Sequence, residues 1–270
     1  MVSMPINRTS VAALTLSTIL AIAYGAYSSS LYEGAPPFIV GTVFKASSIV
    51  ILGAIAIWTA GASPAGADIG RLERAPPGAQ AGRRLALPPS NKLLAAGLLF
   101  GATGDALLAW SPDTFFYGAL AFLIGHLFYI TLFLRAGIGI AAALKQPPRL
   151  IAAVALIIAA FAMTSLLVPR DNPMFAPLAV YTGVLTLMAI CSFTLPWERR
   201  LVMIGAVLFF ISDGFVAWNM FHHDPDPTLA YWRSFAGWMI YWAGPGAICM
   251  GALGLHKKPP PLEGRGLGAG

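Results

Sequence analysis

The chain has 270 residues, of which 57% are hydrophobic and only 10% are charged, and its formal net charge is +6. This composition excludes an ordinary soluble domain and is typical of a protein that crosses the membrane several times. The two cysteines, Cys191 and Cys249, lie in apolar segments. We interpret them as small packing residues, so they predict neither a disulfide nor a metal site.

Eight segments are long and apolar enough to span a bilayer, because about 20 apolar residues cross a hydrocarbon core of roughly 30 Å. We predict transmembrane helices at 10–28, 37–60, 93–110, 114–134, 150–168, 174–195, 201–221 and 235–255. The expected fold is therefore an all-α integral membrane protein, a bundle of eight transmembrane helices that forms one domain over residues 1–255. Arg8 precedes the first segment as in a secretory signal peptide, which leaves its cleavage open.

The basic residues are unequally distributed between the two sides of this bundle. With a cytoplasmic N-terminus, fourteen of the 17 Lys and Arg residues fall on the cytoplasmic side, Arg170 and Arg233 fall outside, and Lys45 lies within a span. The positive-inside rule expects this asymmetry. We therefore predict that both termini are cytoplasmic, in a multi-pass protein of a bacterial inner (cell) membrane. The net charge then reflects topology, and we expect no nucleic-acid partner.

Two segments outside the spans are rich in Pro, Gly and Ala. Residues 61–91 contain repeated Pro and Gly together with four Arg residues and are too polar to be buried in lipid. We expect a flexible cytoplasmic loop there and a disordered cytoplasmic tail at 256–270. Neither segment carries a recognisable catalytic pattern, and the sequence leaves the oligomeric state undefined.

Two aspartates interrupt the apolar segments "FGATGDALLAW" (100–110) and "VLFFISDGFVAW" (207–218). Asp105 lies thirteen residues after Lys92, and Asp213 lies thirteen residues after Arg200, on helices that run the same way. At 1.5 Å per residue both carboxylates are about 20 Å from the cytoplasmic edge. Ionisable residues inside a membrane are costly, so we expect these two to share a functional site.

Other polar side chains are predicted near the same depth. Lys45, Tyr181 and Tyr241 each lie about eight residues, or roughly 12 Å, from the outer edge, and His126 lies somewhat deeper. Each has a structural alternative: Lys45 could form an ion pair that only fixes helix order, the tyrosines could be packing residues, and His126 could be a hydrogen-bonded core residue. Their convergence with two acids favours a water-accessible pocket.

Two facing carboxylates in a medium of low dielectric cannot both remain ionised cheaply, so we expect one to hold a proton. The pair then offers an acid and a base, which suits hydrolysis without a covalent intermediate. Lys45 would keep one acid ionised, while His126 and the tyrosines would orient groups or bind a phosphate. We expect neither a metal nor a cofactor.

Several other functions remain open at this point. Intramembrane Asp, Lys and His residues also mark proton- or ion-coupled transporters. An intramembrane aspartyl protease would need Gly where this chain has Ala102. The "HHDPD" segment (222–226) could hold zinc, but we interpret it as a solvated loop, and a zinc-dependent amidase would need histidines on several spans.

Three motifs resemble the signatures of the lysoplasmalogenase family, also called YhhN-like proteins. They are "GATGDALL" (101–108), "FLIGHLFYI" (122–130) and "GAVLFFISDGFVAW" (205–218), in the family's order and at similar separations. Lys45 and the segment "VYTGVLTLMAI" (180–190) extend the resemblance to roughly residues 10–255. Singly each motif is weak, but as a set they are fairly specific.

The resemblance implies an eight-helix membrane enzyme that hydrolyses the vinyl ether bond of lysoplasmalogens to a fatty aldehyde and a glycerophospho-head-group. Asp105 and Asp213 match the family's proposed catalytic acid and base, without showing which is which. Lys45, His126 and Tyr129 match family motifs, and we expect substrate binding or orientation from a wider set: Lys45, His126, Tyr129, Tyr181, Tyr241 and Ser212. The sequence lacks the usual proline after Lys45 and a glutamine expected near 241–246. These differences leave undetermined which head group and which hydrocarbon chain the lipid substrate carries.

Overall fold

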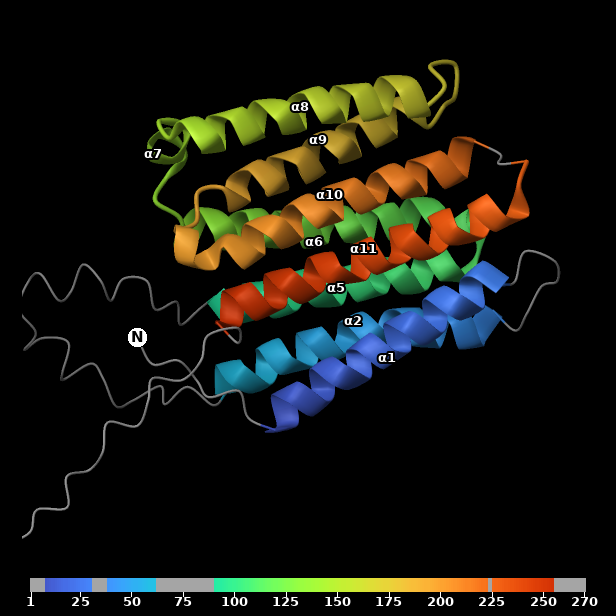
Figure 1. Cartoon of the computed structure of the whole chain (residues 1–270), viewed down its shortest axis with the longest axis horizontal. Coiled ribbons are helices and arrows are strands. Elements are labelled where there is room, and N and C mark those ends of the chain that lie inside the picture. Colours follow the sequence, from blue (N-terminus) through green and yellow to red (C-terminus); the bar gives the residue numbers. More distant parts are fainter. Residues whose placement is uncertain (1–7, 31–37, 62–89, 223–224, 255–270) are drawn as a thin grey trace, which may run out of the picture.

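A computed structural model describes residues 8–30, 38–61, 90–222 and 225–254, and this part of the chain is entirely helical between its turns. All eight segments predicted to span the membrane are helices (Figure 1): α1 (Arg8–Ser30), α2 (Phe38–Gly61), α5 (Ser90–Trp110), α6 (Phe115–Ala136), α8 (Pro147–Leu167), α9 (Phe175–Ser192), α10 (Arg200–Phe221) and α11 (Pro227–Leu253). The described residues add three short elements that we did not predict: η1 (Pro112–Thr114), α7 (Ile140–Leu144) and η2 (Trp197–Arg199).

Seven of the described helices are long and apolar enough to cross a membrane, which makes the chain a multi-pass membrane protein. The eighth predicted span, α11, is not among them, although its 27 residues measure about 40 Å along the axis. Besides Arg233 and Ser234 its sequence contains several Trp and Tyr residues, Pro245 and four Gly residues, and these lower its hydropathy along its whole length. The structure thus supports seven of the eight predicted spans.

The loop and tail predictions fall mostly on residues that the structure does not describe. Gly61, Ser90 and Asn91 were expected in the loop, but they belong to the ends of α2 and α5. The remainder of the loop, 62–89, and the tail, 256–270, lie outside the described residues. Flexibility there stays a prediction.

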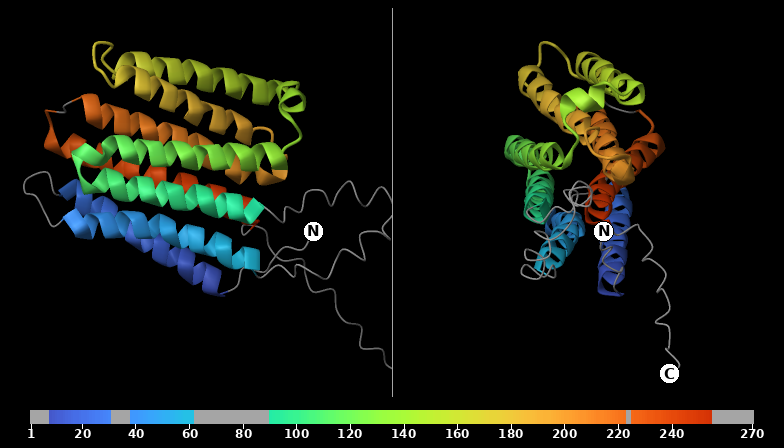
Figure 2. Two further views of the ribbon diagram at one scale, coloured as in Figure 1. Left: turned by 180° about the vertical axis from the view of Figure 1, so that it is seen from behind. Right: turned by 90° about the vertical axis from the view of Figure 1, so that its left-hand side faces the viewer.

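The helices lie side by side and alternate in direction, so α1 begins and α11 ends at the same end of the bundle (Figure 1). We predict that this end is cytoplasmic from the charge distribution alone. Helix α8 lies at one margin and packs mainly on α9, whereas α11 packs on α10, α1, α2 and α5 (Figure 2). The last helix therefore occupies the interior and connects the two halves of the bundle.

Tryptophan side chains of α11 attach it to the first helix. The Trp238 Nε1 group donates a hydrogen bond to the Ala21 carbonyl oxygen at 2.7 Å, and the Trp242 Nε1 group donates to the Ser17 hydroxyl at 3.1 Å. Tryptophan offers a large apolar ring and one polar N–H, so it can pack between helices while its N–H is satisfied. These contacts fix α1 against α11.

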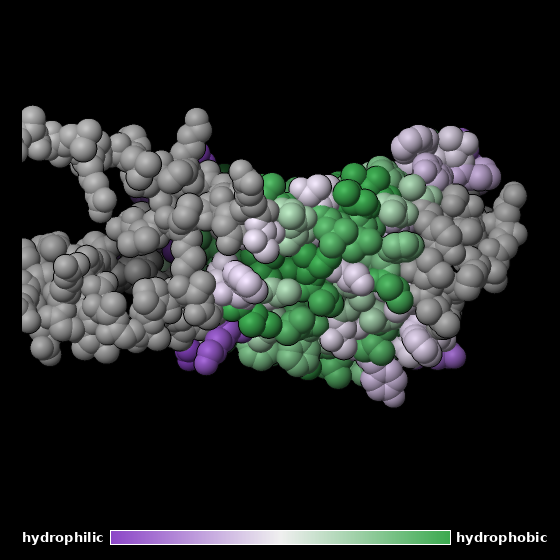
Figure 3. All heavy atoms as spheres, turned by 90° about the horizontal axis from the view of Figure 1, so that it is seen from below, coloured by the Kyte–Doolittle hydropathy of each residue, from purple (hydrophilic) through white to green (hydrophobic). Residues whose placement is uncertain are grey.

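The lateral surface of the bundle is apolar. Seen from the side of α1 and α2, hydrophobic residues cover the middle of the molecule and hydrophilic residues lie toward its two ends (Figure 3). On α8, Ile151, Ile158, Phe161 and Leu166 are all more than 60% exposed. Such a surface is stable only in contact with lipid, as expected for a membrane protein.

Helices α10 and α11 approach each other closely at Gly205, and we expect substitution there to destabilise the fold. A Cβ atom at Gly205 would lie 2.6 Å from the Gly244 carbonyl oxygen and 2.8 Å from the Ile248 nitrogen, both backbone atoms that cannot move away. Gly205→Ala should therefore lower the free energy of unfolding by about 1–3 kcal/mol. The matched control is Gly183→Ala, because a Cβ there meets nothing within 4 Å. Equal thermal midpoints for the two variants in detergent would contradict this packing.

Candidate active site

A cavity of about 300 Å³ lies within the bundle, at the place where most of the predicted polar side chains meet. Six of the predicted site residues line it: Lys45, Asp105, Tyr181, Ser212, Asp213 and Tyr241. They come from α2, α5, α9, α10 and α11, so segments distant in sequence meet at one depth. Their expected convergence is thus seen in the structure, while their chemical roles stay predictions.

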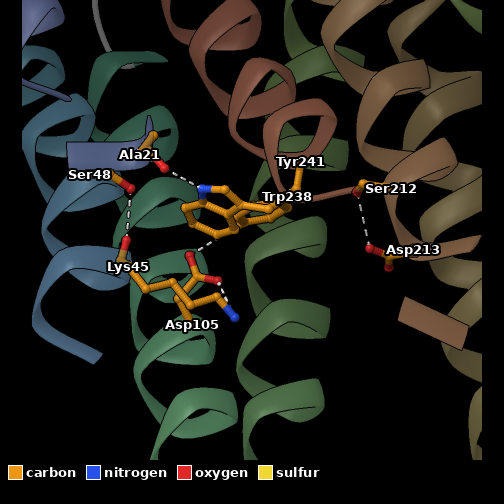
Figure 4. Close-up of polar contacts among 8 residues, drawn as sticks. All are labelled: Ala21, Lys45, Ser48, Asp105, Ser212, Asp213, Trp238 and Tyr241. Carbon is orange, nitrogen blue, oxygen red and sulfur yellow. Dashed lines mark hydrogen bonds and ion pairs between the residues drawn. The ribbon is translucent and has the colours of Figure 1, made fainter. Parts of the chain in front are cut away.

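Asp105 is almost completely buried, with 1% of its surface exposed, yet both of its carboxylate oxygens have partners. The Lys45 Nζ atom lies 3.4 Å from Oδ1, and the Tyr241 hydroxyl donates a hydrogen bond to Oδ2 at 2.7 Å. Figure 4 shows both contacts, made by side chains from three different helices. An opposite charge and a hydrogen-bond donor favour the ionised form, so Asp105 is best described as a buried carboxylate.

The Lys45 ammonium group has aromatic rings as further neighbours. Its Nζ atom lies 5.8 Å from the centre of the Tyr24 ring and 5.6 Å from the centre of the Trp238 ring. Both distances are within the range of cation–π attraction, which compensates partly for the loss of water around a buried cation. Neither ring was predicted from the sequence to lie at the site. Trp238 could have been found, because it lies one helical turn before Tyr241 on the same face, but nothing marked Tyr24.

Asp213 has a different environment from Asp105, although it lines the same cavity. Its carboxylate is only partly buried, and among the described residues no cation forms an ion pair with it. The Ser212 hydroxyl lies 3.5 Å from Oδ1 but donates a shorter bond, 2.6 Å, to the Phe209 carbonyl oxygen. The carboxyl group also interacts with the Tyr181 hydroxyl. Two acids with such unequal partners are suited to hold different protonation states.

His126 and Tyr129 are buried beside the cavity but do not line it. The His126 ring packs edge-on against the rings of Tyr181 and Phe209, and neither of its nitrogens has a hydrogen-bond partner among the described residues. The Tyr129 ring stacks on Phe133. Any effect of His126 on the cavity would therefore pass through neighbouring rings such as Tyr181, and the orienting roles predicted for His126 and Tyr129 stay untested.

The "HHDPD" segment connects α10 to α11, and its described residues have structural contacts. The His222 ring stacks on Trp218 with 4.6 Å between ring centres. Asp226 caps α11, because its Oδ1 atom accepts a hydrogen bond from the Thr228 backbone N–H at 2.8 Å. His223 and Asp224 lie outside the described residues.

A match to a protein-family model shows which family this chain belongs to. Residues 41–252, most of the chain, match the model of the YhhN family. The chain belongs to the YhhN family. The match includes Lys45 and both aspartates, but it begins after α1, so the contribution of Tyr24 lies outside it.

Two mammalian relatives match part of this YhhN-family chain. Lysoplasmalogenase TMEM86B of Mus musculus is 36% identical over 132 residues, which cover 49% of this chain and 53% of the relative. Lysoplasmalogenase TMEM86B of Rattus norvegicus is 35% identical over 135 residues, covering 48% and 50%. The chain thus spans about half the length of the curated relatives it matches. No solved structure matches it significantly.

Loss of the Tyr241 hydroxyl should destabilise this YhhN-family protein. In Tyr241→Phe the Asp105 Oδ2 atom would lose its 2.7 Å donor while remaining buried, which should cost about 1–3 kcal/mol. Tyr117→Phe is the matched control, since Tyr117 is 62% exposed. Thermal unfolding in detergent should show a lower midpoint for Tyr241→Phe alone. An unchanged midpoint would mean that the hydroxyl does not support Asp105.

Proposed function

We propose that this protein is a lysoplasmalogenase that hydrolyses the vinyl ether bond of lysoplasmalogens, releasing a fatty aldehyde and a glycerophospho-head-group. The observation that carries the proposal is one membrane-embedded cavity with two unequal aspartates, Asp105 paired with Lys45 and Asp213 without a cation among the described residues. Family membership and the names of the two relatives support the same chemistry. We also propose a bacterial inner (cell) membrane as its location, with both termini on the cytoplasmic side because of the charge asymmetry.

In the first step Asp213 acts as the acid. Its carboxyl proton goes to the second alkenyl carbon of the vinyl ether, and the double bond becomes a C–H bond and an oxocarbenium ion at the carbon beside the ether oxygen. The Asp105 carboxylate faces the same cavity and stabilises this positive charge. The contacts from Lys45 and Tyr241 hold Asp105 in place, so little reorganisation accompanies the reaction.

In the second step Asp105 acts as the base. Water adds to the oxocarbenium carbon, and Asp105 takes the water proton to leave a neutral hemiacetal. The bond between the hemiacetal carbon and the glycerol oxygen then breaks. As it breaks, the hemiacetal hydroxyl returns a proton to Asp213, and Asp105 delivers its proton to the leaving glycerol oxygen. Both aspartates return to their starting states, and one water molecule is consumed for each aldehyde formed.

The proposal predicts selectivity for the vinyl ether double bond, because protonation at carbon needs an alkene. Detergent-purified protein should release aldehyde from a 1-alkenyl lysophospholipid and should not cleave matched lipids with a saturated 1-alkyl ether or a 1-acyl ester. Products can be measured by mass spectrometry. Cleavage of the ester at a comparable rate would indicate a general lipid hydrolase, and no cleavage of any lipid by folded protein would remove the proposal.

A further inference from the structure

The cavity continues from the two aspartates to the end of the bundle where α10 ends and α11 begins. Its lining there includes Asn219 of α10 and Ser234 of α11, together with apolar Val216 and Met220. Asn219 lies six residues beyond Asp213, which corresponds to about 9 Å along the helix axis. This end of the cavity, called the mouth below, therefore carries polar side chains near the end of the bundle, whereas the carboxylates lie deeper.

The polar residues at this mouth are organised by an arginine. The Arg233 Nε group donates a hydrogen bond to the Asn219 Oδ1 atom at 2.8 Å, and its guanidinium lies 5.8 Å from the centre of the Trp218 ring. The Asn219 amide group in turn donates to the Ser234 hydroxyl at 3.4 Å. Arg233 lies eight residues before Tyr241 on the same helical face, so it lies about 12 Å from the Tyr241 level along α11.

A phosphate in this cavity would need a cation other than Lys45. Lys45 is the only basic residue among the described lining residues, and it already pairs with Asp105 and contacts two aromatic rings. Arg233 does not itself line the cavity, but it is hydrogen-bonded to Asn219, which does, and so it places a second positive charge beside the mouth. Arginine binds phosphate oxygens through a planar fork of N–H donors, and Asn and Ser side chains can add further donors.

We propose that Arg233, Asn219 and Ser234 form the binding site for the phosphodiester of the lysolipid head group. This inference rests on the proposed function. In a 1-alkenyl lysophospholipid six covalent bonds separate the reacting carbon from phosphorus, a reach of about 7 Å at the roughly 1.2 Å per bond of an extended chain. The acids and the mouth are about 9–12 Å apart along the helix axes. The side chains at both levels extend toward the lipid and cover the remaining few ångströms, so the length of the lipid fits this distance.

The placement also gives the orientation in which the substrate enters. A phosphate at the mouth lies at the membrane surface, and the sn-1 linkage lies below it, as in a lipid of the adjoining leaflet. The substrate then enters head group outward, without inversion, and its alkenyl chain lies against apolar lining residues at the level of the acids, such as Phe122 beside Tyr241. The site thus selects phosphate-bearing vinyl ethers at the surface of that leaflet.

Binding of a lipid that cannot be hydrolysed tests this site separately from catalysis. The probe is a saturated 1-alkyl lysophospholipid, titrated into the purified full-length protein, wild type or Arg233→Gln. We expect at least roughly tenfold weaker binding by Arg233→Gln, because a charged hydrogen-bonded contact is lost. Arg170→Gln is the matched control: Arg170 is exposed and lies in the α8–α9 turn at the same end of the bundle (Figure 1), without the hydrogen bond to Asn219 that Arg233 makes.

A second variant and a second probe make each outcome of this binding experiment decisive. Ser234→Ala, a small change at the mouth, should also weaken binding and serves if Arg233→Gln does not fold. Equal losses in Arg170→Gln and Arg233→Gln would overturn the site in favour of general surface charge. Inorganic phosphate is the second probe, and binding as tight as that of the lysolipid would overturn the assignment to a lipid head group.

Kinetics then separate the two proposals. With 1-alkenyl lysophospholipid the Michaelis constant of Arg233→Gln should rise about tenfold, and the preference of the wild type for this substrate over phosphate-free 1-alkenylglycerol should disappear. Aldehyde release with no such change would contradict the head-group site while leaving the hydrolase intact. Arginine-dependent lipid binding without any aldehyde would support the head-group site and contradict the hydrolase.

Discussion

Asp213→Asn should reduce aldehyde release from a 1-alkenyl lysophospholipid by at least roughly 100-fold, the usual contribution of a general acid. The carboxamide has nearly the same shape as the carboxyl group but cannot deliver a proton to the alkene carbon. The fold should persist, because Asp213 is only partly buried and its described serine contact is long, at 3.5 Å. Initial rates and thermal midpoints measured on the same preparations check both statements.

The matched control for this change is Asp113→Asn. Asp113 is an exposed aspartate in η1, and it does not line the cavity. Its amide variant should retain wild-type activity. If Asp213→Asn kept more than about a tenth of the wild-type rate, Asp213 could not be the acid, and the assignment of roles to the two aspartates would have to be reversed or abandoned.

Lys45→Met should destabilise the protein by about 3–5 kcal/mol, the range seen when one partner of a buried ion pair is removed. The Asp105 carboxylate would remain 1% exposed without the cation that lies 3.4 Å away. Aldehyde release should also fall, because Asp105 would no longer be held ionised as the base. Unfolding in detergent and initial rates give the two measurements.

A double variant distinguishes the ion pair from simple loss of packing. Lys45→Met combined with Asp105→Asn removes both charges, so it should recover most of the lost stability while remaining inactive. Lys92→Met, at the exposed start of α5, is the control for removal of one positive charge. If the double variant were as unstable as Lys45→Met, the stability of this region would not depend on the ion pair.

The depth of the two carboxylates could be predicted from the sequence because helical rise is regular. Asp105 and Asp213 each follow a basic residue by thirteen positions, and the structure places both at one cavity. The start of α11 was predicted eight residues late, at 235. Asp226 as N-cap and Pro227 at the first helical position mark the true start, and both signals are present in the sequence.

Contacts between helices could not be predicted in the same way, because depth does not determine which faces meet. Tyr24 and Trp238 contact Lys45 only because α1 and α11 both pack against α2. His126 has a depth compatible with the site, but the rotation of α6 directs it against Tyr181 and Phe209 instead of into the cavity. A polar residue at the correct depth therefore indicates a site without establishing that it reaches the substrate.

Hydrolysis of a 1-alkenyl lysophospholipid in water enriched in oxygen-18 tests the central claim most directly. Water that adds to the oxocarbenium carbon leaves the original ether oxygen on glycerol. We therefore expect aldehyde formation together with a glycerophospho-product that carries no heavy oxygen. Heavy oxygen in the glycerophospho-product would mean that water attacks the glycerol carbon, and the absence of aldehyde from folded protein would exclude vinyl ether hydrolysis; either result would contradict the account.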